Sequence, residues 1–473
     1  MKRFAAVLLL LVLLHAVTMS VYLHRLPGLL GDEGSEGENV WEILDSKQVT
    51  IYGERSYIGP AMDYLRIPFV LVFGYNALAL RIPIVILSVL TFFLAAAVFR
   101  KLFGEEAALY IVAALFFSPA YLLYQRLGWA ITIILFFALF TVWLLQQRSP
   151  WKFLWAGLAA GIGLHNHFIF LPTLAALVIT YVLFGLTTVT ALNRKYLLLL
   201  LQNAAGALIG FAAGFSTQLA VLLTMKEDQG EPGQIVSLFT DRLWQLPEVL
   251  PKFISGSIFS AFYTGEPLAV WLIASIMAAL VILIICGFLF SAQKKALGWW
   301  LLGMIIQLII LVLIIDRFAA RYLIMTTLSV WGMAGFGLYA VAVKCMGTRV
   351  TAHAIASVVL VVTLIIAFTA PALAAFLRTG GSTAPVVITE KRSEPAAAFV
   401  DVRELLTCVS NQGPVYSDSV HIYNRLLYLS HSNPGLQVTE NEDEAAMIVD
   451  YRLPDAAPGS ACPELRHFTV SPN

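Results

Sequence analysis

The chain has 473 residues, of which 59% are hydrophobic and only 12% carry a charge, and its mean hydropathy is +0.81. Ordinary soluble proteins carry about 25% charged residues, so this composition excludes a soluble globular protein and indicates a polytopic membrane protein. The net charge of +1 and the lack of a run rich in lysine and arginine give no indication of a nucleic-acid partner.

The N-terminal segment starts with two basic residues and continues as an apolar run from Phe4 to Val21. A cleaved signal peptide and an uncleaved membrane helix are the two interpretations of such a run. We expect an uncleaved helix, because the run of about 18 residues is long enough to cross a bilayer and longer than a signal-peptide core. No clear small-residue cleavage site follows it before the polar segment.

Ten further apolar runs are expected to cross the membrane, which predicts an all-α polytopic protein of about eleven transmembrane helices. These runs are 78–99, 106–124, 127–146, 152–165, 168–186, 197–223, 267–290, 297–315, 322–343 and 351–377. With the N-terminus in the cytoplasm, every inner loop carries lysine or arginine, as the positive-inside bias requires. The basic residues of these loops are Lys2, Arg3, Arg100, Lys101, Arg148, Lys152, Arg194, Lys195, Lys294, Lys295, Lys344 and Arg349.

This orientation predicts two domains. Residues 1–377 form a transmembrane domain with outer loops at 27–77 and 224–266, and residues 378–473 form a small α/β domain on the extracytoplasmic side. In the tail, AAAFVDVRELLTCVS and HIYNRLLYLSH are typical of helices, and GPVYSDS and AAMIVDYRL are typical of strands. Cys408 and Cys462 both lie in this outer domain, where an oxidising compartment permits a disulfide; two free thiols are the alternative.

Several function classes are disfavoured by missing motifs. The chain has no GxxxxGK[ST] phosphate loop and no GxGxxG after a strand, which argues against an ATP-driven pump. The run GLAAGIG at 157–163 is instead typical of a small-residue face that packs against another helix. The spans are almost free of charge and polar residues gather at their outer ends, which favours chemistry at the outer surface over transport through the midplane.

The polar segment from Gly31 to Arg66 is the strongest candidate site. It begins with the paired carboxylates Asp32 and Glu33 directly after the first span. A carboxylate at this place can act as a general base toward an acceptor hydroxyl or amine. The alternative is a solvated loop rich in acids, with Glu36, Glu38 and Glu42 among its exposed residues.

Arginines at the outer ends of other spans are candidates for binding a phosphate. Arg126 follows the third span, and Arg317, Arg321 and Tyr322 lie in DRFAARYL between the ninth and tenth. A guanidinium group matches phosphate oxygens, and arginine at an outer boundary runs against the positive-inside bias. Interfacial snorkelling is the alternative.

Three further residues are candidates for substrate binding: His165 and His167 in the turn LHNHF, and Tyr57 in the acidic segment. Ordinary interfacial hydrogen bonds are the alternative for the histidines, and no neighbouring cysteine or histidine cluster completes a metal site. The segment 226–266 is amphipathic and either lies in the interface beside a lipid substrate or packs on the bundle.

The order of these motifs over residues 1–345 resembles the GT-C glycosyltransferases of the protein O-mannosyltransferase and aminoarabinose-transferase type. GDEGSEGENVWEIL resembles the acidic loop of that superfamily, FGYNALALRIP its next block, LFFSPAYLLYQRLGW its SP…Y..R segment and ARYLIM its RYL motif. The tail with GPVYSDSVHIYNRLLYLSH is similar to outer domains of some bacterial members.

The resemblance implies a bacterial plasma-membrane enzyme of the cell envelope that uses a polyprenyl-phosphate sugar. Asp32, with Glu33 beside it, would activate a glycan, lipid or protein acceptor, and Arg126, Arg317, Arg321 and Tyr322 would hold the donor phosphate. No cofactor is indicated, and a divalent cation is compatible with the pattern without being required by it.

One departure from the superfamily pattern concerns a second acidic residue that many relatives carry after the SP…R segment. The matching stretch here, LGWAITII, has no acid. Glu33 or another residue then substitutes for it, or the acceptor differs, or activity is lost. The alternatives to a glycosyltransferase are a non-catalytic membrane protein of the same fold that acts in assembly or binding, and a lipid or sugar transporter.

Overall fold

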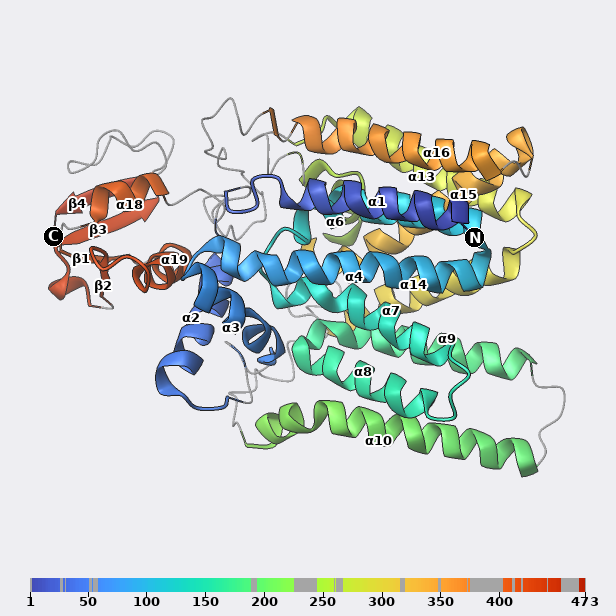
Figure 1. Ribbon diagram of the computed structural model, residues 1–473, viewed down its shortest axis with the longest axis horizontal. Helices are drawn as coiled ribbons and strands as arrows, with labels where there is room; N and C mark the ends of the chain where they lie inside the picture. The colour runs from blue at the N-terminus through green and yellow to red at the C-terminus, as the bar shows by residue number, and fades with distance from the viewer. Residues whose placement is uncertain are drawn as a thin grey trace.

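The computed structural model describes residues 2–25, 29, 31–50, 53, 58–188, 194–224, 245–258, 260, 267–314, 320–347, 350–371, 373–374, 403–410, 413–417, 420–439, 441–451 and 468–472. Its long helices lie side by side in one bundle, with the N-terminus at one end (Figure 1). Two shorter helices, α2 and α3, and a small α/β unit lie at the opposite end. The polar segment and the C-terminal region therefore share one end of the bundle.

Each expected span contains a helix of the bundle, although several of these helices are shorter than the expected span; the helix in the expected span 127–146, for example, begins only at Ile134, after a 3₁₀ turn. These helices are α1 (Lys2–Ser20), α4 (Ala77–Phe103), α5 (Glu105–Phe116), α7 (Ile134–Leu145), α8 (Lys152–Asn166), α9 (Leu171–Thr188), α10 (Arg194–Thr224), α13 (Val270–Phe290), α14 (Lys294–Ile314), α15 (Ile324–Met346) and α16 (Val350–Leu364). Within the described ranges, 7 helical stretches are long and apolar enough to cross a membrane. The all-α membrane fold is confirmed, while about eleven crossings stay a prediction.

One expected span is divided in two. Residues 106–124 were expected to form a single helix, but α5 ends at Phe116 and a short helix, α6 (Pro119–Tyr124), follows it. Proline has no backbone N–H to continue a helix, and its fixed φ suits the first turn of a new one. Ser118 caps this new helix, because its hydroxyl oxygen accepts a hydrogen bond from the Tyr121 backbone N–H at 3.4 Å.

Glycines bring α8 and α10 into backbone contact, as the small-residue run predicts. A Cβ atom added at Gly157 would overlap the Ala207 carbonyl oxygen, and one added at Gly161 would overlap that of Phe211. In the reverse direction, a Cβ at Gly210 would overlap the Leu154 carbonyl oxygen. Close helix contact through small residues is a common way to hold helices together where lipid offers no hydrophobic driving force.

The region 27–77, expected as an outer loop, contains two helices among its described residues, α2 (Gly31–Ser46) and α3 (Ala61–Phe73). Buried residues of α2 recur three to four positions apart, which is the spacing of one helical face. They include Glu33, Glu36, Val40 and Ile43. The buried face of this helix therefore carries two carboxyl groups as well as apolar side chains.

The C-terminal unit has the expected α/β character. Its strands β1 (Pro414–Tyr416), β2 (Gln437–Val438), β3 (Met447–Tyr451) and β4 (Phe468–Pro472) form a sheet in the order β2-β1-β3-β4, in which only the β3–β4 pair is antiparallel. The helices α18 (Arg403–Val409) and α19 (Val420–Ser430) coincide with the two expected helical stretches. The unit has its own apolar core, formed by Leu405, Val409, Val415, Leu426, Leu436, Met447 and Val449.

Cys408 lies in α18 and is bonded in a disulfide, whereas Cys286 and Cys345 are free thiols. Cys462 lies outside the described residues, and its pairing with Cys408 stays a prediction. Short elements complete the fold and include η1 (Ala130–Ile133), η2 (Phe168–Phe170), η3 (Ala320–Leu323), a π-helical turn at Ile365–Thr369 and η6 (Glu442–Glu444).

Two glycines of α10 allow a matched test of the helix contact. We expect Gly210→Ala to lower the stability by about 1–3 kcal/mol, because the new methyl group forces the backbones of α10 and α8 apart. Gly206→Ala is the control, since the nearest atom to its new methyl group is 3.7 Å away, and alanine favours a helix by up to about 1 kcal/mol over glycine. Thermal unfolding in detergent measures both, and equal unfolding temperatures would contradict the close packing.

Candidate active site

The first turn of α2 places two neighbouring carboxylates in different surroundings. Acidic residues are favourable at a helix N-terminus, which explains why Asp32 and Glu33 begin this helix. Adjacent residues on a helix point about 100° apart. Glu33 consequently points into the protein, where it has no exposed surface, while the side chain of Asp32 is 23% exposed.

Glu33 forms a fully buried, two-pronged ion pair with Arg81 of α4. The Arg81 Nε and Nη2 atoms donate to the two Glu33 carboxylate oxygens at 2.8 and 2.6 Å, and Nη1 donates to the Leu23 carbonyl oxygen at 2.9 Å. The Gly128 backbone N–H also donates to Glu33 at 2.5 Å. These contacts join the end of α1, the start of α2, helix α4 and the segment after α6.

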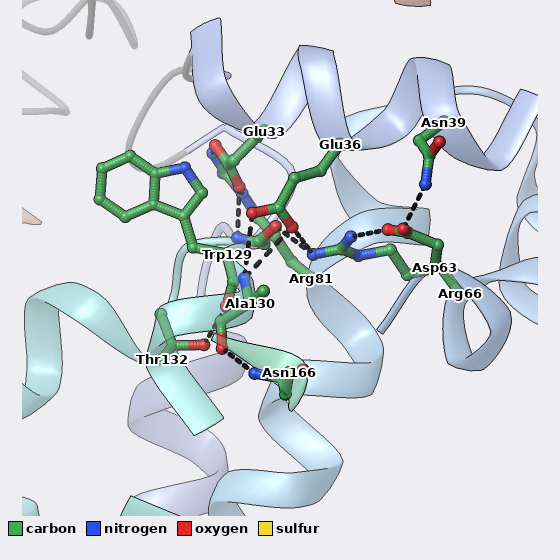
Figure 2. A network of polar contacts seen from close by, with 11 residues as sticks. Glu33, Glu36, Asn39, Asp63, Arg66, Arg81, Trp129, Ala130, Thr132 and Asn166 are labelled. Carbon is green, nitrogen blue, oxygen red and sulfur yellow. Dashed lines mark hydrogen bonds and ion pairs between the residues drawn. The ribbon is translucent and has the colours of Figure 1, made fainter. Parts of the chain in front are cut away.

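A second buried ion pair follows one helical turn later. Arg66 of α3 donates to Glu36 at 2.5 Å, to Asp63 at 2.8 Å and to the Gly128 carbonyl oxygen at 2.5 Å. The Asn39 side-chain amide donates to the other oxygen of Asp63 at 2.5 Å. Figure 2 shows Arg66 between the two carboxylates. The alternative interpretation of this segment as a solvated acidic loop does not hold for Glu36, because its side chain is only 5% exposed.

The backbone of residues 128–130 is held by these carboxyl groups (Figure 2). The Ala130 N–H donates to Glu36 at 3.1 Å, as the Gly128 N–H does to Glu33. On the other side, the Ala130 carbonyl oxygen accepts a hydrogen bond from the Asn166 side-chain amide at 2.8 Å. The backbone of Gly128 and Ala130 is therefore bonded to two acids of α2 on one side and to Asn166 on the other, and these buried polar groups are paired.

The buried cluster has more acidic than basic groups. Three carboxyl groups, on Glu33, Glu36 and Asp63, face the two guanidinium groups of Arg66 and Arg81. Burial, partly opposed by the Arg66 charge and assisted by the Asp63 charge, raises the pKa of Glu36 from its ordinary value of 4.5 to about 8. A proton on Glu36 removes the excess negative charge from the interior.

Asp32 faces Arg321 on the partly exposed side of α2, outside the buried cluster. An Arg321 Nη1 atom lies 3.7 Å from an Asp32 carboxylate oxygen, which is longer than a hydrogen bond. The Arg321 guanidinium lies 5.2 Å from the centre of the Trp129 ring and 5.5 Å from that of the Tyr322 ring. Both side chains of the pair are partly exposed, at 23% for Asp32 and 24% for Arg321. The structure thus brings together three residues that the sequence nominates, Asp32, Arg321 and Tyr322.

Arg126 binds the C-terminal end of α1. Its Nη1 donates to the Thr18 carbonyl oxygen at 2.6 Å, and its Nη2 donates to that of Val21. Only 6% of the residue is exposed. These bonds cap carbonyl groups at the end of the helix, and a role of Arg126 in binding a donor phosphate stays a prediction.

The two predicted substrate-binding histidines are hydrogen-bonded to other residues of the protein. The His165 ring shares a hydrogen bond of 3.2 Å with the Thr217 hydroxyl, and the His167 ring accepts one of 3.1 Å from the Ile169 N–H. Among the described residues, no three His, Cys, Asp or Glu side chains gather in a way that could hold a metal ion. Tyr57, Arg317 and most of the segment 226–266 lie outside the described residues.

Asp63, Arg66 and Arg81 belong to the cluster around α2, but they are not among the residues predicted from the sequence. A signal was available, because the tetrapeptide Leu-Arg-Ile-Pro occurs twice, at 65–68 and at 80–83. Each copy places its arginine in a helix facing one of the two inward carboxyl groups of α2. The helical spacing of Glu33, Glu36 and Val40 was the other signal.

Residues 59–214, about one third of the chain, match the family described as Dolichyl-phosphate-mannose-protein mannosyltransferase. No curated protein sequence matches the chain significantly.

Two crystal structures of ArnT from Cupriavidus metallidurans have a similar fold. The one bound to undecaprenyl phosphate has 14% identity and a TM-score of 0.56, covering 94% of this chain and 93% of that chain. The apo form has 12% identity and a TM-score of 0.53, covering 98% and 97%. The chain thus has the fold of the GT-C glycosyltransferases, which confirms the resemblance that the motifs indicate.

Two matched substitutions test whether Glu33 and Glu36 contribute differently to stability. We expect Glu33→Gln to lower stability by about 3–5 kcal/mol, because Arg81 is left as a buried charge without its partner. Glu36→Gln resembles the protonated acid and should be tolerated. The folded protein binds the Glu36 proton more tightly than the unfolded chain, so its stability falls as pH rises from 4.5 to about 8.

The Glu36→Gln variant should lose that fall with pH. Unfolding in detergent at pH 6 and pH 9 measures both effects. Equal destabilisation by the two substitutions at pH 6 would contradict the difference between the acids.

Proposed function

We propose that this protein is a membrane glycosyltransferase that moves a sugar from a polyprenyl-phosphate donor to an acceptor on the extracytoplasmic face. The observation that carries the proposal is the Asp32–Arg321 pair, a partly exposed carboxylate opposite a partly exposed guanidinium at one end of an apolar bundle. The fold shared with ArnT bound to undecaprenyl phosphate supports a lipid-linked donor. The match to the mannosyltransferase family over 59–214 supports the same class of reaction.

In this proposal Asp32 is the general base. A carboxylate oxygen of Asp32 takes the proton of an acceptor hydroxyl or amine as that group attacks the anomeric carbon of the sugar. A new bond forms between acceptor and sugar, and the bond between sugar and phosphate breaks. The electron pair of the broken bond leaves with the polyprenyl phosphate. Attack opposite the leaving group inverts the anomeric configuration.

Arg321 is the donor-side residue of the pair. Negative charge grows on the phosphate as it leaves, and a fixed cation beside it stabilises that charge in the transition state. The faces of Trp129 and Tyr322 next to the guanidinium hold it in place through cation–π contacts. Arg317 remains a second candidate on the same segment, and Tyr57, His165 and His167 remain candidates for substrate binding.

Glu33 has a positioning role in this scheme and not a chemical one. It is fully buried and both its oxygens are bonded to Arg81, so it cannot reach a substrate without breaking that pair. This burial argues against Glu33 as the substitute for the second acid that the family resemblance leads us to expect. Asp32 is then the residue of the acidic pair that can exchange a proton with an acceptor.

Replacing Asp32 tests the proposal. We expect Asp32→Asn to reduce transfer from a lipid-linked sugar in proteoliposomes by about 100- to 10,000-fold, the usual contribution of a general base. Asp45→Asn is the matched control, because Asp45 is an exposed residue of the same helix. Mass spectrometry of the acceptor measures the product. Undiminished transfer by the Asp32→Asn variant would exclude Asp32 as the base, and uptake of sugar into vesicles without a covalent product would indicate a transporter.

A further inference from the structure

Helix α19 of the C-terminal unit packs directly against α2, the helix that carries Asp32 (Figure 1). Two glycines of α2 make this contact. A Cβ atom added at Gly34 would lie 2.7 Å from the Asn424 carbonyl oxygen, and one at Gly37 would lie 2.5 Å from the Tyr428 ring. The glycines are three residues apart and thus on one face of the helix. That face of α2 has no space for side chains because α19 fills it.

Tyr428 connects this contact to the rest of the site. Its ring has no exposed surface, and its hydroxyl donates to the Asn76 carbonyl oxygen at 3.1 Å. Asn76 is the N-cap of α4, where its side chain accepts hydrogen bonds from Leu78 and Ala79. One turn further along, α4 carries Arg81, which holds Glu33. Tyr428 therefore contacts both helices that form the buried ion pair.

Other residues of α19 and the turn after it contact α2 just before its start and in its middle. Arg425 is fully buried and donates to the Leu29 carbonyl oxygen, just before α2, at 3.3 Å. His431 stacks on the Trp41 ring with a centroid distance of 4.3 Å and a hydrogen bond of 2.9 Å to Glu38. The contacts thus extend from Leu29, two residues before the helix, to Trp41 in its third turn.

We propose that α19 is a positioning element of the active site, with Tyr428 and Arg425 as its positioning residues. Asp32 lies two residues before Gly34, so a tilt of α2 away from α19 moves the carboxylate relative to Arg321. The C-terminal unit then helps to position Asp32 and is not only a separate outer domain. This inference rests on the proposed function, since it assigns Tyr428 and Arg425 an effect on transfer through Asp32.

Substitutions at Tyr428 test the inference. We expect Tyr428→Ala to lower kcat by about 100-fold, the effect of a misplacement of about 1 Å. The KM for the lipid donor should change less than about twofold, because Arg321 does not lie on α2. Tyr428→Phe keeps the ring against Gly37 and loses one hydrogen bond, so it should restore kcat to within about fivefold of the natural protein. Asp443→Asn, an exposed change in the same unit, is the control and should have no effect.

Amide hydrogen exchange separates positioning from general unfolding. In the full-length Tyr428→Ala protein, amides of α2 should exchange faster, while those of the buried helix α5 should keep their protection. The inference is overturned if the variant transfers sugar at the natural rate, if α2 exchange is unchanged, or if α5 loses protection together with α2. If the natural protein transfers no sugar, the proposed function fails, and the α2 exchange still decides whether α19 holds this helix in place.

Discussion

Glu33 and Arg81 share two hydrogen bonds within the protein interior, where neither side chain has exposed surface. Removing two charges from water is costly, and their attraction compensates for it only when the geometry is good and the remaining donors and acceptors are satisfied. Here the Leu23 carbonyl and the Gly128 N–H satisfy them. Helices α1, α2 and α4 and the segment after α6 must therefore keep their relative positions.

The position of Asp32 is a consequence of this pair. With Glu33 turned inward and Glu36 held by Arg66 one turn later, the rotation of α2 about its axis is fixed. The neighbouring carboxylate then points to the accessible side, opposite Arg321. Two adjacent acids in one polar segment thus differ in their surroundings: Glu33 holds the helix, while Asp32 is partly exposed and, in our proposal, contacts the acceptor.

Some of this arrangement could be predicted from the sequence and some could not. Apolar runs locate the bundle helices because burial in lipid is decided by local composition. The Asp32 and Arg321 candidates come from local motifs. Arg81, by contrast, is 48 residues from Glu33, and nothing local shows that the two meet. The acids of α2 resemble a solvated loop in composition, and only their helical spacing and the repeated Leu-Arg-Ile-Pro sequence indicate an inward face.

The most direct test of the account is an electron cryomicroscopy structure of the protein in a lipid nanodisc with a bound polyprenyl phosphate. We expect a phosphate oxygen within hydrogen-bond distance of Arg321, about 2.7–3.2 Å, with Asp32 exposed beside it. The Glu33–Arg81 pair should be unchanged. A phosphate bound away from Arg321, or a Glu33 side chain that leaves Arg81 to contact the ligand, would contradict the account.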